Sequence, residues 1–139
     1  MPVRKAEAVW NGDLVHGNGT ATVAGQQIKY SFSSRFEDGA GSNPEELIGA
    51  AHAGCFSMAF AAGLGKAGFK PERVATTAEV SIEKVGEGFK ITKIVLRTRA
   101  TVPGMDRSRF MELAEGAKKG CPVSQALSAV PIELDAQLG

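Results

Sequence analysis

The stretch Asn43–Gly68, NPEELIGAAHAGCFSMAFAAGLGKAG, decides the fold of this 139-residue chain. Asn43 can cap a helix, Pro44 suits the first helical position, and Glu46 stands three residues after Asn43 in capping-box spacing. Residues 47–65 contain no Asp, Glu, Lys or Arg, and apolar side chains occur on every face of the predicted helix. A helix of this kind is buried on all sides, either in a protein core or in a membrane.

The uncharged run spans 19 residues, close to the roughly 20 that cross a bilayer, so a membrane helix is one alternative. The run is rich in Ala and Gly, poor in Leu and Ile, and carries His52. This composition favours a central helix of a folded domain, where small residues let neighbouring backbones come close. Cys55 lies at the midpoint of that helix.

Length and composition predict a single domain, residues 1–139, that buries about two-thirds of its unfolded surface. The net charge is +1 with acidic and basic residues interleaved, which argues against binding to nucleic acid or to an anionic membrane. The start, MPVRKAEAVW, has no apolar run of the signal-peptide type, so we expect a cytoplasmic location. In a reducing compartment Cys55 and Cys121 are expected to be core thiols or redox-active thiols. Two cysteines and two histidines without close spacing do not suit a structural zinc site.

The rest of the chain predicts an α+β fold of order βββ-α-ββ-α-α-β, with antiparallel sheets packed around the central helix. Arg35 is expected at the far end of the third strand, where the alternative is a solvated charge without a role. In the strand expected at residues 89–102, apolar residues switch from odd to even positions, which predicts a β-bulge near Thr92 or Lys93. The strands are expected at residues 5–10, 20–24, 27–36, 78–82, 89–102 and 131–138, and the two later helices at 105–119 and 122–130.

The two thiols are candidates for chemistry, and the local sequence does not decide which of them attacks. Cys55 in an apolar helix is expected to be a weak nucleophile, because desolvation disfavours the thiolate. Cys121 begins a short helix beside Lys118 and Lys119, which favours a thiolate there. His52 lies three residues before Cys55 on the same helix face, as in a cysteine hydrolase, but no orienting third residue is evident. For both cysteines the alternative is an inert packed thiol.

Three segments resemble the OsmC/Ohr family, the osmotically inducible protein C branch in particular: RFE at Arg35, NPEELIGAAHAGCFSMA around Cys55, and GCPVSQAL around Cys121. The resemblance covers nearly the whole chain. It implies an intertwined homodimer that reduces organic hydroperoxides in the response to oxidative or osmotic stress. It also implies that Cys55 is the peroxidatic cysteine, Cys121 the resolving cysteine, Arg35 the catalytic arginine and Glu45 the carboxylate that holds it. No bound cofactor or metal is expected, and the implied reductant is an external dithiol such as a dihydrolipoyl protein.

Helix geometry, apart from the resemblance, limits which groups can serve Cys55. Glu45 and Cys55 are ten residues apart on one helix, roughly 15 Å along its axis. An ion pair of Arg35 with Glu45 cannot easily serve Cys55 of the same helix, so we expect a homodimer whose sites are shared. Apolar side chains are expected to line a pocket for the organic part of the substrate, namely Phe36, Ile48, Phe56 and Met58. The non-enzymatic alternatives are a binding protein for an apolar ligand in the same crevice and a structural stress protein.

Overall fold

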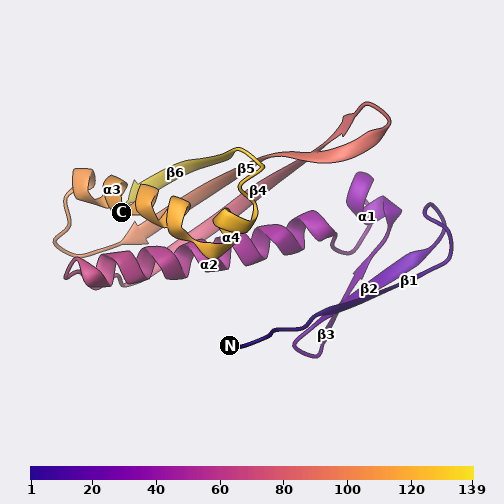
Figure 1. Ribbon diagram of the computed structural model, residues 1–139, viewed down its shortest axis with the longest axis horizontal. Helices are drawn as coiled ribbons and strands as arrows, with labels where there is room; N and C mark the ends of the chain where they lie inside the picture. Colours follow the sequence, from indigo (N-terminus) through magenta and orange to yellow (C-terminus); the bar gives the residue numbers. More distant parts are fainter. The chain divides into compact units, whose positions relative to one another are not determined.

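A computed structural model describes residues 1–139, and the chain divides into two compact units, Met1–Leu47 and Ile48–Gly139, which are described separately below. The α+β class is confirmed, and the structure adds one short helix that the sequence did not predict. The elements, labelled in Figure 1, are β1 (Glu7–Asn11), β2 (Asn18–Val23), β3 (Gln26–Tyr30), α1 (Phe32–Phe36), α2 (Pro44–Lys66), β4 (Arg73–Val85), β5 (Gly88–Thr101), α3 (Arg107–Gly120), α4 (Pro122–Ala126) and β6 (Ile132–Leu138).

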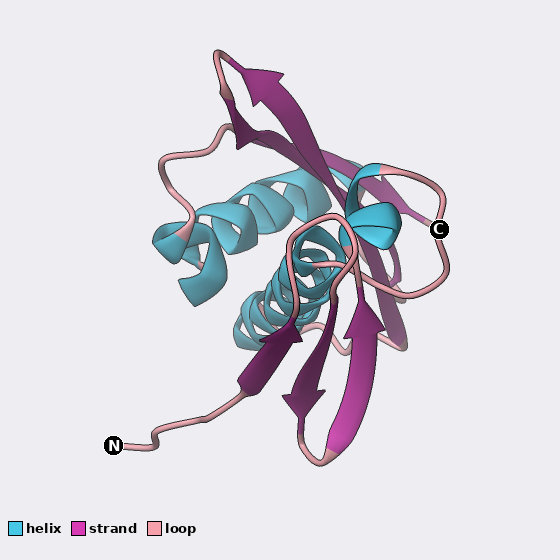
Figure 2. Cartoon of the chain, turned by 90° about the vertical axis from the view of Figure 1, so that its right-hand side faces the viewer, coloured by secondary structure: helices cyan, strands magenta, loops and turns pink.

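The N-terminal unit is built on the predicted antiparallel meander, with the strand order β1-β2-β3 (Figure 2). The rings of Trp10 and Tyr30 pack over β2, with their centroids 5.6 Å apart. Gly19 lies beneath them, and a Cβ added to it would stand 2.5 Å from the Tyr30 ring and 2.7 Å from the Trp10 ring. This position therefore requires glycine for lack of space.

The third strand ends earlier than predicted, at Tyr30 rather than at Phe36. Ser31 caps the helix α1 instead: its hydroxyl accepts the Ser34 amide at 3.1 Å, and the Ser34 hydroxyl accepts the Ser31 amide at 2.8 Å. This reciprocal capping box satisfies two backbone donors and turns the chain into a helix. Arg35 consequently lies in the last turn of α1, and its predicted position on a strand was wrong.

The central helix α2 begins as predicted. The Asn43 side chain accepts the Glu46 amide at 2.8 Å, which confirms Asn43 as the cap. The second half of the expected capping box is not formed, because the Glu46 carboxylate accepts the hydroxyl of Ser42 at 2.7 Å. Beyond the helix, Gly68 adopts a positive φ of 91°, a conformation that favours glycine and ends the element.

The C-terminal unit contains the sheet β4-β5-β6. Strands β4 and β5 are antiparallel, but β6 runs parallel to β5, so the prediction of purely antiparallel sheets was wrong for this strand. A parallel neighbour needs a crossover, and α3 and α4 supply it. The predicted bulge is confirmed: Ser81 pairs with Lys93 and Ile82 with Ile91, which leaves Thr92 as the extra residue.

Helices α2 and α3 cover one face of this sheet (Figure 1). The Phe60 ring contacts the rings of Phe56 and Phe110, with centroids 5.7 and 5.2 Å apart, and all three side chains are fully buried. By length and composition α2 could cross a membrane, and only 28% of its most apolar 18-residue window is buried within the chain. Phe56, Phe60 and Leu64 of α2 are packed into a protein core, but the expectation that the helix is buried on all sides is not met within this chain.

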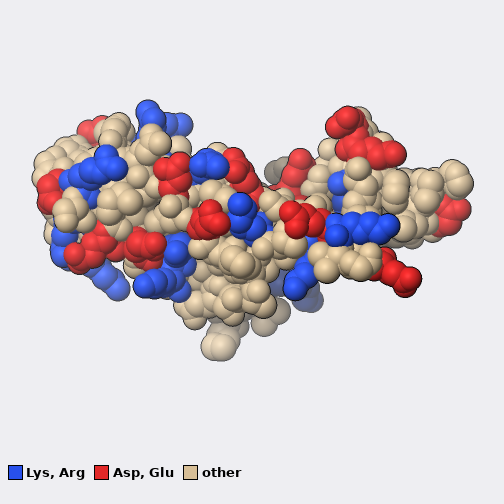
Figure 3. Space-filling model, turned by 90° about the horizontal axis from the view of Figure 1, so that it is seen from above, with Lys and Arg blue, Asp and Glu red and all other residues tan.

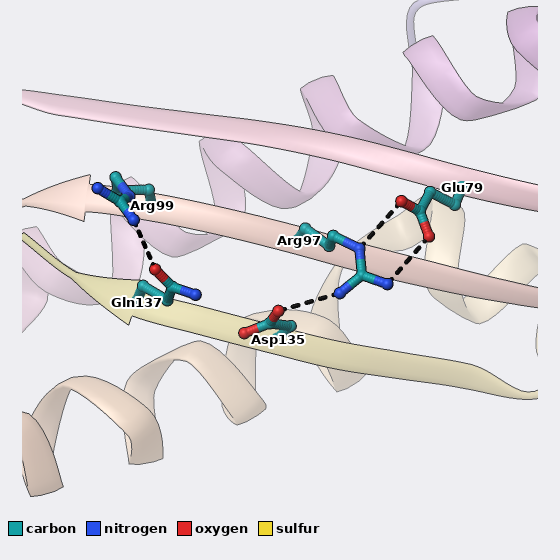
Figure 4. Close-up of polar contacts among 5 residues, drawn as sticks. All are labelled: Glu79, Arg97, Arg99, Asp135 and Gln137. Carbon is teal, nitrogen blue, oxygen red and sulfur yellow. Dashed lines mark hydrogen bonds and ion pairs between the residues drawn. The ribbon is translucent and has the colours of Figure 1, made fainter.

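The other face of the sheet carries charged side chains that are paired with one another. Arg97 donates to Glu79 at 3.0 and 3.1 Å and to Asp135 at 3.0 Å, and Arg99 donates to Gln137 at 2.7 Å (Figure 4). On the face shown in Figure 3, basic and acidic side chains are likewise interspersed. Exposed pairs of this kind contribute only about 0–1 kcal/mol each, so they balance charge more than they stabilise the fold.

Candidate active site

In the N-terminal unit the structure brings Arg35 and Glu45 together. The Arg35 Nε donates to Glu45 Oε1 at 2.9 Å, and its Nη2 lies 2.8 Å from the same oxygen. The Glu45 side chain is 7% exposed and the Arg35 side chain 36% exposed. The carboxylate thus anchors a guanidinium that stays partly exposed.

Three local contacts hold this ion pair in place. The Ser34 hydroxyl donates to the carbonyl of Ser42 at 2.6 Å, and the Asn43 amide group donates to the carbonyl of Ser34 at 3.1 Å. These bonds join α1 to the start of α2, which carries Glu45. The guanidinium also lies over the Phe36 ring, 5.1 Å from its centroid, a cation–π contact. Arg35 is therefore fixed in orientation and is not a freely solvated charge.

In the C-terminal unit the structure brings the two cysteines together as free thiols. Cys55 is partly exposed on α2, and Cys121 is fully buried at the N-cap position of α4. The two side chains are neighbours, although they are far apart in the sequence, and each thiol shifts the pKa of the other. A sulfenic acid on either sulfur would therefore have the other thiol as its neighbour.

The two thiols differ in acidity. Burial raises the pKa of the Cys55 thiol above its ordinary value, and the neighbouring Cys121 raises it further. Burial also acts to raise the pKa of Cys121, but hydrogen bonds from Cys55, from the Ser124 amide and hydroxyl and from the Val123 amide outweigh it, so the pKa is lowered. The sequence expectation that Cys121 is the more acidic thiol agrees with these directions.

A cysteine hydrolase would require a hydrogen bond between His52 and Cys55, but His52 has a different partner. Its Nε2 lies 2.7 Å from the hydroxyl of Ser124, and its buried Nδ1 has no hydrogen-bond partner. Burial lowers the pKa of this imidazole, which keeps the ring neutral. Sequence reasoning missed Ser124, although its place three residues after Cys121 in the first turn of α4 was a usable signal.

The predicted pocket residues have different environments. Phe56 is fully buried in the core of the C-terminal unit, so its predicted role in lining a pocket was wrong. Met58, on the same helix, is 76% exposed, and Ile48 is half-buried. No group of three or more His, Cys, Asp or Glu side chains is arranged to hold a metal ion. The N-terminal unit thus holds an anchored guanidinium, and the C-terminal unit holds a thiol pair.

The chain is similar to two named bacterial proteins. Peroxiredoxin OsmC of Escherichia coli K12 is 54% identical over 138 residues, which cover 97% of this chain and 96% of that protein. An organic hydroperoxide resistance protein of Xanthomonas axonopodis pv. citri is 37% identical over 89 residues, 63% of this chain and 61% of that protein.

Solved structures share the fold at low sequence identity. The organic hydroperoxide resistance protein OsmC of Legionella pneumophila superposes with a TM-score of 0.74 at 24% identity, covering 99% of both chains. An OsmC-like protein of Mycoplasma pneumoniae has a TM-score of 0.78 at 18% identity, covering 99% of this chain and 97% of that one. The family described as OsmC-like protein matches residues 37–135, and the chain belongs to that family.

Proposed function

We propose that this protein is a thiol-dependent peroxidase that reduces organic hydroperoxides to alcohols through Cys55 and Cys121. The observation that carries the proposal is the neighbouring pair of free thiols, one partly exposed and one fully buried. The names of the relatives, a peroxiredoxin and an organic hydroperoxide resistance protein, support a peroxide-related redox role. We further propose a cytoplasmic location, where the thiols stay reduced between turnovers.

In the first step, the Cys55 thiolate attacks one peroxide oxygen and the O–O bond breaks. Cys55 becomes a sulfenic acid, and the other oxygen leaves as an alkoxide that takes up a proton to give the alcohol. The Arg35 guanidinium stays charged at any working pH and can stabilise both the thiolate and the leaving oxygen. Glu45 fixes the orientation of the guanidinium through its short contacts with Nε and Nη2 of Arg35.

In the second step, the Cys121 sulfur attacks the sulfenic sulfur of Cys55. A disulfide forms, and the displaced hydroxide leaves as water with the proton of the Cys121 thiol. An external dithiol, which we propose to be of the dihydrolipoyl type, then returns both cysteines to thiols by exchange and is itself oxidised to a disulfide.

We also propose that the active unit is a homodimer in which Arg35 and Glu45 of one copy serve Cys55 of the other. Among the groups of its own unit that shift the pKa of Cys55, none is a cation, so the charge has to come from elsewhere. Ten residues of sequence separate Glu45 from Cys55, which disfavours a site within one helix. The large apolar area that α2 leaves uncovered supports a second copy as its partner.

The test of catalysis follows the loss of cumene hydroperoxide in the presence of dithiothreitol. We expect Cys55→Ser to abolish turnover and Cys121→Ser to allow one turnover before the reaction stalls. The alternative, a non-catalytic binding protein for an apolar ligand, predicts no peroxide loss and unchanged ligand binding when both cysteines are replaced. Peroxide loss that persists in Cys55→Ser would refute the assignment of the attacking thiol.

Mixing two inactive variants tests the shared site. Arg35→Ala and Cys55→Ser are each expected to be inactive as homodimers. In a mixed dimer, the cysteine of the first chain meets the arginine of the second and one site is complete. A random equimolar mixture should regain about a quarter of the wild-type activity, because half of the dimers are mixed and each has one of two sites. Subunits that have exchanged without regaining activity would refute shared sites.

A further inference from the structure

The buried hydrogen bond between His52 and Ser124 joins the two elements that carry the cysteines. His52 stands three residues before Cys55 on α2, and Ser124 stands three residues after Cys121 on α4. The two residues are 0% and 5% exposed, and the Nε2–Oγ distance is 2.7 Å. A buried polar pair of this kind stabilises the fold only modestly, and it specifies position more than it adds stability.

The direction of this hydrogen-bond chain follows from the number of protons available. Ser124 has a single hydroxyl proton, and its hydroxyl acts to lower the pKa of the Cys121 thiol, the effect of a donor beside that sulfur, so we infer that it donates toward Cys121. The Ser124 oxygen then accepts from His52, which places the imidazole proton on Nε2. Nδ1 is left with a lone pair, in agreement with its lack of any partner. The donors run in one direction, from His52 through Ser124 to Cys121.

We propose that His52 and Ser124 are positioning residues for the resolving cysteine, which hold the Cys121 sulfur against Cys55 and stabilise its thiolate while the disulfide forms. This inference rests on the proposed function, since it concerns the second step of that reaction. As the Cys121 thiol gives up its proton and its sulfur attacks, the S–O bond of the Cys55 sulfenic acid breaks, and the displaced hydroxide takes up that proton and leaves as water. His52 acts as a hydrogen-bond donor throughout and neither gains nor loses a proton.

No other charged group competes with this arrangement at Cys121. From α2, the groups beside it are the Cys55 thiol and the neutral His52, and α4 carries no ionisable side chain. At the end of α3, Lys118 is paired with Glu115 at 3.2 Å and Lys119 is exposed. The acidic residues of β6 are paired with bases across exposed strands: Glu133 with Lys93 at 4.0 Å and Asp135 with Arg97 at 3.0 Å.

The test compares Ser124→Ala with Ser124→Thr and with Ser128→Ala, a matched control at an exposed serine four residues further on. Reduced protein receives one equivalent of cumene hydroperoxide, and a dimedone-type reagent traps the Cys55 sulfenic acid over time before mass analysis. We expect the sulfenic acid to persist about tenfold longer in Ser124→Ala, the effect of losing one hydrogen bond to a charged sulfur. The threonine variant and the control should resolve at the wild-type rate.

A titration distinguishes this role from a merely structural one. In a Cys55→Ser background, the absorbance at 240 nm reports the Cys121 thiolate. Removal of the Ser124 hydroxyl should raise the pKa of Cys121 and move the titration to higher pH, whereas Ser128→Ala should not. If Ser124→Ala and Ser128→Ala agree in both the sulfenic-acid lifetime and the titration, the inference is wrong.

Two variants of His52 make the test independent of the serine. His52→Gln keeps an N–H donor without a titrating ring and should retain resolution, whereas His52→Leu should slow it about tenfold. Equal rates in these two variants would overturn the proposed donor role. A wild-type protein that forms neither sulfenic acid nor disulfide would refute the proposed function itself, and the titration of Cys121 would still test the hydrogen-bond chain.

Discussion

Replacing Glu45 by Gln leaves the Arg35 guanidinium in place but removes the charged partner that fixes its orientation. The carboxylate accepts the Arg35 Nε–H at 2.9 Å and lies 2.8 Å from Nη2. Gln keeps the side-chain length and one oxygen acceptor, but it removes the negative charge. It also turns an N–H₂ group, which can only donate, toward a guanidinium that cannot accept. Arg35 then remains charged but loses the partner that fixes its direction.

The size of the effect follows from these contacts. A hydrogen bond to a charged group contributes about 1.5–3 kcal/mol, against about 0.5–1.5 kcal/mol for a neutral one. Losing the charge at two contacts therefore costs about 2 kcal/mol, which is reduced because the Arg35 side chain is 36% exposed and partly screened. We expect kcat/KM for cumene hydroperoxide to fall about tenfold, equivalent to about 1.4 kcal/mol.

The assay is steady-state peroxide consumption with dithiothreitol, and Glu46→Gln is the matched control. Glu46 is adjacent in sequence and exposed, and its carboxylate accepts the Ser42 hydroxyl rather than an arginine. This control should stay within about twofold of the wild-type rate, as expected for an exposed surface contact. Equal losses in the two variants, or no loss in Glu45→Gln, would refute the reasoning that the ion pair aims the guanidinium.

Four further substitutions test the thiol environment and the packing. Cys121→Ala removes a neighbour that raises the pKa of Cys55, so alkylation of Cys55 by iodoacetamide should reach its half-maximal rate at lower pH; an unchanged or higher midpoint would contradict the coupling. Phe60→Ala should lower the free energy of unfolding in urea by about 3–5 kcal/mol, because it opens a cavity in the core. Gly19→Ala should lower the free energy of unfolding by about 1–3 kcal/mol through overpacking. Gly116→Ala in α3, where an added Cβ meets nothing within 4 Å, should raise it by about 0.5–1 kcal/mol. The same denaturation assay decides the sign of both changes.

The elements that the sequence predicted correctly have local signals. The cap of α2 needs only Asn43 and the amide three residues later. The bulge at Thr92 is visible as a change of apolar phase within one strand, because a single extra residue exchanges the two faces of a sheet. Both features depend on residues within a few positions of each other.

The features that the sequence did not predict depend on competition between two local structures or on pairing between distant segments. Apolar and polar residues alternate from Ile28 to Phe36 as in a strand. A helix forms at the end of this segment instead, because the capping box of Ser31 and Ser34 satisfies backbone donors where β3 ends. The direction of β6 depends on α3 and α4, since alternation is the same for either direction.

The site was predictable in part. A carboxylate at Glu45 for the Arg35 guanidinium was expected from the resemblance, and the ion pair is present. The Ser124 contact was not expected, because its partner His52 lies 72 residues away and a buried hydroxyl leaves no periodic pattern. A long-range polar pair inside a core becomes visible only when two elements are packed together.

The chain gives its two thiols opposite environments, and this asymmetry links the proposed chemistry to assembly. Within the C-terminal unit, hydrogen bonds lower the pKa of the Cys121 thiol, while burial and the neighbouring Cys121 raise the pKa of the Cys55 thiol. A peroxidase needs the reverse order, because the attacking thiolate must form before the resolving one is used. Under the proposed function, Arg35 of a second copy supplies the missing positive charge to Cys55, and the pKa of the attacking thiol falls only in the dimer. An unassembled chain would then leave Cys55 unreactive, which makes the anchored guanidinium the group that converts dimer formation into peroxidase activity.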